Sequence, residues 1–249
     1  MSTPTLYVFA ISHYCEKARW ALEFLGIDCK VRGIAPGLHT RLQKKYGLAA
    51  SSLPLLISGS DVVHGSAAIL DWAEEQATNG KTLTPESDAA NCRAVEGRLD
   101  DIAGVHTRRY FYSEALLEHP DKVKPAFLEG IPWYERPMLH LMWPRITPIM
   151  AERMDLGREQ GEESREIVDS ELNWIESFLA EGRDYLVGDG LTRADITAAS
   201  LFGRLSGTSD HPRKSETFLP PGMSADQAAW RDRPALAWVR RIYAEHRTA

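Results

Sequence analysis

The alternation of apolar and polar positions changes about a third of the way along the chain. Before that point, short apolar runs of strand type are interspersed with stretches of helical period, about 3.6 residues. Beyond Thr84-Pro85 the pattern is helical. Because this order separates a mixed layer structure from a helical one, we expect an α/β domain over residues 1–80 and an all-helical domain over residues 89–249.

The first domain is predicted to contain four strands and two helices. The β-prone run at residues 5–10 is the first strand, and Gly26 ends the helix that follows it. The order is βαβ and then ββα, which predicts a mixed sheet with helices. The predicted strands are 5–10, 29–34, 53–57 and 61–64, and the predicted helices are 15–25 and 66–76.

The second domain is predicted to contain helices at 91–117, 158–180 and 234–246. Thr192 and Asp195 fit a capping box, in which a hydroxyl and a carboxylate each satisfy a backbone N–H at a helix start. Residues 118–157 are rich in Pro, Trp, Met and Tyr, so we expect an insertion of short, kinked helices. The Gly/Ser/Pro-rich stretch 206–223 predicts a loop.

The composition excludes several classes of protein. The 249 residues are 43% hydrophobic and 26% charged, as in globular domains, and no apolar run approaches the roughly 18 residues of a membrane span. A net charge of −6 without dense Lys/Arg blocks argues against nucleic-acid binding. Three cysteines without metal-type spacing predict neither a disulfide framework nor a metal site. We therefore expect a cytoplasmic protein that binds no membrane, nucleic acid or metal.

Candidate chemistry begins at the first helix. Ser12 places a hydroxyl just before the helix N-terminus, where the helix dipole and outward-pointing N–H groups stabilise an anion such as a thiolate. The alternative is that Ser12 only caps the helix. Cys15 is interpreted as a packing residue, with reactive-thiol chemistry as the alternative.

Four landmarks in order carry a family resemblance: the run Ser12 to Cys15, Leu53-Pro54, Gly65-Ser66, and the run Tyr185 to Asp195. With them the chain resembles the cytosolic glutathione transferase superfamily, with a serine-type site, over nearly its whole length outside residues 118–157. The resemblance implies a thioredoxin-like domain that binds glutathione as co-substrate and an all-helical domain that forms an electrophile pocket. It also implies a homodimer.

The resemblance further implies roles for residues of the first domain. Ser12 would hydrogen-bond the glutathione sulfur, and Tyr7 is the alternative hydroxyl. Leu53, before a cis Pro54, would offer its backbone to the cysteinyl part of glutathione as an added strand does. Ser66 would hold the γ-glutamyl carboxylate at a helix start, unless it only caps that helix.

One position departs from the family pattern. An acid or amide usually precedes this serine and helps to recognise the γ-glutamyl group, whereas Gly65 stands here. Candidate substitutes are His64, Asp71, and Asp100 or Asp101 of the partner subunit. The departure weakens the case for ordinary glutathione affinity.

The electrophile pocket is predicted to draw on the first long helix of the second domain and on the insertion. The candidates are His106, Arg109, Tyr110 and Trp133. Aromatic rings suit a small hydrophobic electrophile, and Arg109 is a candidate for binding a substrate carboxylate. The alternative is that each ring belongs to the core.

These residues predict a glutathione transferase that directs a thiolate at a hydrophobic electrophile. The alternative from another class is a transferase-like binding or scaffold protein with weak or no glutathione turnover, suggested by Gly65 and the insertion. A third hypothesis is a thiol-redox enzyme that uses Cys15. Ser12 stands where a C-x-x-C motif has its first cysteine, which argues against dithiol exchange.

Overall fold

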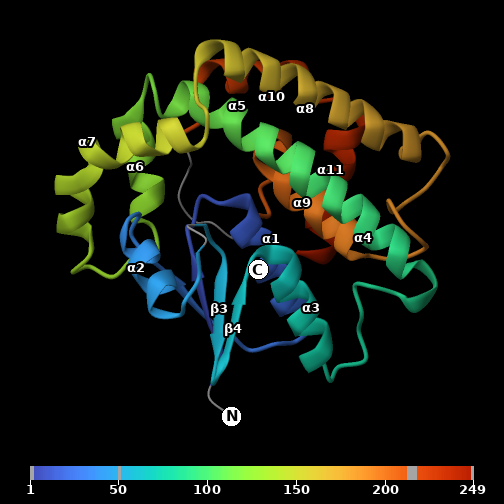
Figure 1. The fold of residues 1–249 in the computed structure, drawn as a ribbon. Helices are drawn as coiled ribbons and strands as arrows, with labels where there is room; N and C mark the ends of the chain where they lie inside the picture. Colours follow the sequence, from blue (N-terminus) through green and yellow to red (C-terminus); the bar gives the residue numbers. More distant parts are fainter. Residues whose placement is uncertain (1–2, 50–51, 212–217, 248–249) are drawn as a thin grey trace. The chain divides into compact units, whose positions relative to one another are not determined.

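The strands of the N-terminal region form one four-stranded sheet in the computed structural model, which describes residues 3–49, 52–211 and 218–247 (Figure 1). The strand order is β2-β1-β3-β4, with β2 parallel to β1 and with β3 antiparallel to β1 and β4. This is the mixed sheet that the sequence predicts. The strands are β1 (Thr5–Val8), β2 (Lys30–Gly33), β3 (Leu55–Ser58) and β4 (Asp61–His64).

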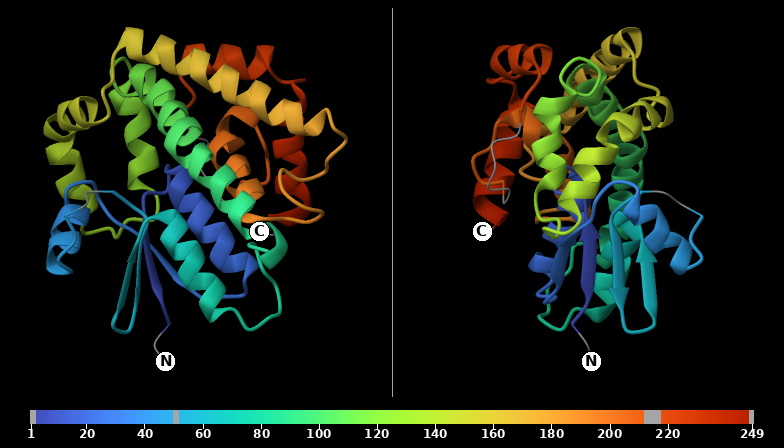
Figure 2. Two further views of the ribbon diagram at one scale, coloured as in Figure 1. Left: turned by 45° about the vertical axis from the view of Figure 1, so that its right-hand side comes forward. Right: turned by 90° about the vertical axis from the view of Figure 1, so that its left-hand side faces the viewer.

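Alternation along β1 separates a core side of the sheet from a second side. Leu6 and Val8 are buried, and two of the helices, α1 and α3, lie side by side (Figure 2). Phe9, just after the strand, has its ring centre 6.1 Å from that of Phe127. The helices of residues 1–81 are α1 (His13–Phe24), α2 (Leu38–Lys45) and α3 (Ser66–Gln76).

The chain divides into two compact units. The first unit comprises Met1–Lys81 and Pro120–Met150, and the helical unit comprises Thr82–His119 and Ala151–Ala249. The helical unit therefore differs from the block 89–249 expected from the sequence, because residues 120–150 group with the sheet.

Close backbone contacts attach this segment to β2. The Gly33 N–H donates to the Gly130 carbonyl at 3.2 Å, and a Cβ on Gly33 would lie 2.5 Å from the Gly130 carbonyl carbon, so only glycine fits there. The buried Glu135 accepts from the Ala35 N–H at 3.0 Å and pairs with Arg32 at 3.3 Å. The segment forms α6 (Pro120–Leu128) and α7 (Arg136–Arg153).

Helix α7 is longer than the short helices that the prolines predict. It runs for 18 residues and includes Pro144 and Pro148. Both prolines are exposed. A proline removes one backbone hydrogen bond, and the carbonyl that it leaves free can be hydrated on an exposed face.

The helical unit contains no strand among its described residues, as the sequence predicts. Its first long helix, predicted at 91–117, is a helical run in which the π-helical segment η2 separates α4 from α5. Helix α5 packs along α8. Among the helices of the described residues, none has the length and hydropathy of a transmembrane helix. The elements are η1 (Glu86–Asp88), α4 (Ala89–Arg98), η2 (Leu99–Gly104), α5 (Val105–Ala115), α8 (Arg158–Leu179), α9 (Arg193–Ser206), α10 (Pro221–Ala229) and α11 (Pro234–His246).

The predicted capping box begins α9, which is buried along most of its length. Thr192 is the N-cap residue, and its N–H and hydroxyl donate to Asp195 at 2.8 and 2.7 Å. The predicted loop 206–223 overlaps the start of α10, which the sequence pattern missed, and residues 212–217 lie outside the described residues.

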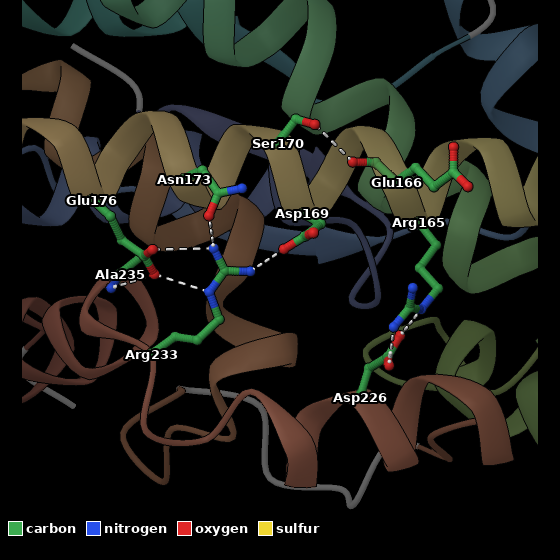
Figure 3. A network of polar contacts seen from close by, with 9 residues as sticks. All are labelled: Arg165, Glu166, Asp169, Ser170, Asn173, Glu176, Asp226, Arg233 and Ala235. Atoms are coloured by element: carbon green, nitrogen blue, oxygen red, sulfur yellow. Dashed lines mark hydrogen bonds and ion pairs between the residues drawn. The ribbon is translucent and has the colours of Figure 1, made fainter.

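Two arginine-centred networks join α8 to the C-terminal helices (Figure 3). Arg233, the N-cap residue of α11, donates to Glu176 at 2.9 Å and also to Asp169 and Asn173. Arg165 donates with two nitrogens to Asp226 of α10, at 2.5 and 2.7 Å. Such bidentate contacts fix the orientation of both side chains.

Candidate active site

The register of the sheet brings three of the predicted segments to one edge. Leu55 at the start of β3 pairs with Tyr7 near the end of β1, and it also pairs with His64 at the end of β4. The segments that carry Ser12, Leu53-Pro54 and Gly65-Ser66 therefore leave the sheet at the same edge. The N-termini of α1 and α3 also begin there.

Ser12 is the N-cap residue of α1. Its side-chain oxygen accepts the Cys15 N–H at 3.4 Å, and its own N–H donates to the Phe9 carbonyl at 3.0 Å. The cap bond is long, and a hydroxyl retains a donor and a further lone pair for another partner. Capping and contact with a ligand are therefore compatible roles for this residue.

The Leu53-Pro54 peptide bond is cis, as the resemblance implies. Leu53 lies beyond the end of the ladder between β1 and β3. The preceding Ser52 is held from two sides, because the buried Gln43 donates to its carbonyl and His64 Nε2 lies 3.0 Å from the same oxygen. His64, considered above as a substitute for the missing acid, thus contacts Ser52.

The backbone conformation at position 65 accounts for the presence of glycine there. Its φ of +93° lies in the region that favours glycine, and it is the N-cap residue of α3. A side chain added there would meet open space. Ser66 is the first helical residue rather than the cap, and the adjacent Gly65 N–H donates to the Pro54 carbonyl at 3.0 Å.

Cys15 is buried, as expected for a residue that packs in the core. It is 3% exposed, and burial raises the pKa of its thiol to about 12. Burial also raises the pKa of Cys29 to about 11 and that of Cys92. Since a reactive thiol needs a lowered pKa, none of these three favours thiolate chemistry.

The predicted pocket residues fall in both units. Tyr110 is buried on α5 and donates its hydroxyl to Asp226 at 2.6 Å, so it extends the Arg165 network, and burial raises its pKa. Trp133, in the first unit, is 80% exposed and does not belong to the core.

His106 and Arg109 meet at a residue that the sequence did not single out. The buried Ser164 hydroxyl accepts from Arg109 Nε at 2.6 Å and lies 3.1 Å from His106 Nδ1. Arg109 also donates to Asp155 at 2.9 Å and to Glu163. Partial burial and the charge of Arg109 lower the pKa of His106. No local motif marks Ser164, because its two partners lie more than fifty residues away in the sequence.

Sequence-family models match both regions of the chain. The glutathione S-transferase N-terminal domain matches residues 6–81, and the glutathione S-transferase C-terminal domain matches residues 138–211. The two matches together span more than half of the sequence. The chain belongs to the glutathione S-transferase superfamily.

Solved structures of this superfamily share the fold. Glutathione transferase GSTFuA3 from Phanerochaete chrysosporium is 18% identical, with 100% of this chain and 99% of that chain covered and a TM-score of 0.68. The β-etherase LigF from Sphingobium sp. strain SYK-6 is 21% identical, with 96% and 99% covered and a TM-score of 0.58. No curated protein sequence matches the chain significantly.

The matched ranges divide the candidate residues of this superfamily member. Ser12, Leu53-Pro54 and Gly65-Ser66 all lie inside the N-terminal match. The run from His106 to Trp133 lies between the two matches. Family membership therefore supports the sheet-edge residues more directly than it supports the predicted electrophile pocket.

Proposed function

We propose that the protein is a glutathione transferase that activates the glutathione thiol through Ser12. The observation that carries this proposal is the shared sheet edge, where the Ser12 hydroxyl, the cis Leu53-Pro54 turn and Ser66 accompany the N-termini of two helices. An anionic ligand is favoured at such helix starts. Membership of the glutathione S-transferase superfamily suggests that this ligand is glutathione.

Each residue has a distinct part in the proposed binding mode. The Leu53 backbone would pair with the cysteinyl backbone of glutathione as an added strand does. Ser66, with the N-terminus of α3, would hold the γ-glutamyl carboxylate. The Ser12 hydroxyl would donate to the sulfur, and lowering a thiol pKa by about two units needs about 2.7 kcal/mol, which one charge-assisted hydrogen bond and the helix dipole can supply.

The proposed reaction joins the sulfur to a carbon of a small hydrophobic electrophile. The thiolate electron pair forms the S–C bond, and the leaving group departs with the electron pair of the bond that breaks. His106, Arg109, Tyr110 and Trp133 remain our candidates for the electrophile site. Among them, His106 Nε2 is the best placed to donate to a substrate oxygen, since Ser164 occupies the other ring nitrogen.

The resemblance supports two further parts of the proposal. We infer a homodimer with the helical run α4 to α5 as the contact, and a cytoplasmic location. Neither is needed for the chemistry at Ser12.

A binding or scaffold protein is the second candidate function, and Gly65 is the observation that favours it. This position has no side chain to meet the γ-glutamyl amine, and His64 is engaged with Ser52. Weak glutathione binding without turnover is the expectation of that alternative. The thiol-redox hypothesis is disfavoured by the buried Cys15 and its raised pKa.

Glutathione binding by calorimetry, with the bound thiol titrated by its ultraviolet thiolate absorbance, tests the proposal. The wild type should bind in the micromolar to low-millimolar range with a thiol pKa below the free value of about 8.5. Ser12→Ala should raise that pKa by about one to two units, at about 1.4 kcal/mol each. Cys15→Ser is the matched control and should leave the pKa unchanged.

Two results would reject the transferase. Absence of binding at about 10 mM glutathione, roughly tenfold above a 1 mM dissociation constant, would leave the scaffold alternative. Loss of activity in Cys15→Ser with full activity in Ser12→Ala would support the redox hypothesis instead.

A further inference from the structure

Exposed apolar side chains concentrate in one short segment of the first unit. Six large hydrophobic residues of the described chain are exposed, and four of them lie between residues 133 and 149. Trp133 is 80% exposed and Leu141 is 74% exposed. Single exposed apolar residues are ordinary, but a concentration of them in one short segment points to a surface that binds a partner. The four are Trp133, Tyr134, Leu141 and Ile149.

Helix α7 is apolar on two opposite sides. Leu139 and Trp143 are buried, and the Trp143 ring lies 5.3 Å from that of Phe127. The other side exposes a second apolar row at helical spacing, formed by Pro137, Leu141, Pro144 and Pro148. The apolar face of a helix is normally covered, whereas this second row is exposed.

The charges on α7 are mainly positive. Arg136, Arg145 and Arg153 are exposed, and the one carboxylate of the helix is the exposed Glu152 in its last turn. Within the described part of the chain, neither Arg136 nor Arg145 forms an ion pair with a carboxylate. This cationic stretch stands in a protein whose net charge is −6.

The charge pattern selects among the partners that an apolar surface can have. Two copies paired through α7 would bring together three arginines and only one glutamate from each helix, and this excess of positive charge is unfavourable. An anionic surface would pair with them. Trp and Tyr beside an apolar row, bordered by arginines, is the composition of helices that lie in the headgroup layer of a bilayer.

We propose that the α7 surface, formed by Trp133, Tyr134, Leu141, Ile149 and the flanking Arg136 and Arg145, binds peripherally to membranes that contain anionic phospholipid. The apolar side chains enter the headgroup layer, and the arginines pair with lipid phosphates. This contact differs from a membrane span, and it replaces the expectation from the sequence that the protein binds no membrane. It does not depend on glutathione binding.

Flotation of the full-length protein with lipid vesicles tests this proposal. The protein should float with vesicles of equimolar phosphatidylcholine and phosphatidylglycerol and much less with phosphatidylcholine alone. Arg136→Glu combined with Arg145→Glu should weaken partitioning by about tenfold or more. Leu141→Ser combined with Ile149→Ser should do the same. The control Leu117→Ser changes an exposed leucine of the helical unit, 45% exposed, and should float as the wild type does.

Thermal unfolding followed by circular dichroism shows that each variant is folded. Absence of flotation with the anionic vesicles overturns the proposal, and so does flotation that the arginine and Leu141 variants leave unchanged. A concentration-dependent oligomer that Leu141→Ser dissociates would assign the surface to a second copy instead. Flotation that falls as salt rises is the expected behaviour, because exposed charges are screened within about 10 Å at 0.1 M salt.

Discussion

Polar side chains serve different purposes at the sheet edge and inside the helical unit. At the edge, Ser12 makes one long cap bond, and Ser66 begins a helix that has no side-chain cap. In the helical unit, the buried Asp195 accepts from Leu186 and Thr192. The buried Asp226 accepts from Tyr110 and from Arg165, and Figure 3 shows the Arg165 contact. Polar groups are therefore satisfied internally where helices are joined, and they keep unused hydrogen-bonding capacity at the edge, where we propose that a ligand binds.

The buried ion pair between α4 and α9 gives the largest expected effect. Glu96 and Arg193 are both nearly inaccessible, with 2.6 Å between Oε2 and Nε. Glu96→Ala leaves the Arg193 charge buried without this carboxylate, so the free energy of unfolding should fall by about 3–5 kcal/mol. Urea denaturation measures the loss.

Two controls make this prediction specific. The buried Ser66 has no hydrogen-bond partner for its hydroxyl among the described residues, so Ser66→Ala should change the free energy of unfolding by less than about 1 kcal/mol. Glu96→Leu combined with Arg193→Met removes both charges and should recover much of the loss. Equal losses in Glu96→Ala and Ser66→Ala would contradict the contrast between the two regions.

Asp195 predicts a pH dependence of stability. Burial raises its pKa from 3.8 to about 6, although the Leu186 N–H and both Thr192 donors favour the carboxylate. Because the folded state then binds the proton more tightly than the unfolded chain, its contribution is fully present below about pH 4 and is lost as pH rises through 6. The change is about 3 kcal/mol.

The measurement is the free energy of unfolding between pH 4 and 7. Asp195→Asn should remove most of this contribution to the slope. The cap should only be weakened, because the amide oxygen of asparagine can still accept a hydrogen bond from the backbone N–H. A slope of the same size in Asp195→Asn would show that other groups cause it.

Local signals predicted much of the fold. The limits 66–76 and 234–246 agree with α3 and α11, because Gly65-Ser66 and Pro234 mark the helix starts clearly. The four strands and the start of α9 also agree. The placement of residues 120–150 was not predictable in this way, because α7 is apolar on both sides and its attachment depends on the Gly33–Gly130 contact, about a hundred residues apart in the sequence.

The candidate site divides in the same manner. Ser12, the cis Leu53-Pro54 bond and Ser66 follow short motifs, so the sequence places them at strand and helix ends. Gln43 and Ser164 escaped notice because a glutamine or a serine in a helix is informative only through its distant partners. Patterns of neighbouring residues predict elements, whereas supporting hydrogen bonds require the tertiary structure.

Gly65→Gln tests whether the open edge lacks a recognition group. The variant places an amide in open space, and the resemblance implies that an acid or amide here recognises the γ-glutamyl group. Glutathione affinity should rise by about tenfold, as expected for one hydrogen bond to a charged group. Stability should fall by about 1 kcal/mol, because φ is +93°.

Gly65→Ala separates these two effects. It carries the same backbone penalty without the amide, so calorimetry should show wild-type affinity together with the loss of stability. Equal affinity in the alanine and glutamine variants would mean that position 65 does not contact the γ-glutamyl group.

His106 combines a satisfied and an unsatisfied hydrogen-bonding group in one side chain, and it gives the smallest expected effect. One ring nitrogen is engaged inside the helical unit, and the other has no partner among the described residues. Arg109 always donates, so the Ser164 hydroxyl accepts its proton at 2.6 Å and directs its own hydrogen to His106 Nδ1, its nearest acceptor. Neutral His106 should therefore carry its proton on Nε2, ready to donate to a ligand.

Nitrogen chemical shifts of the imidazole measure this tautomer directly. In the wild type, at a pH above the lowered pKa of His106, we expect the Nε2–H form to predominate. Ser164→Ala should return the ring toward a mixture of tautomers, with a change in the free energy of unfolding of about 1 kcal/mol. Nδ1–H imidazole in the wild type would reverse the direction of the bond to Ser164, and His106 would then offer a ligand an acceptor instead of a donor.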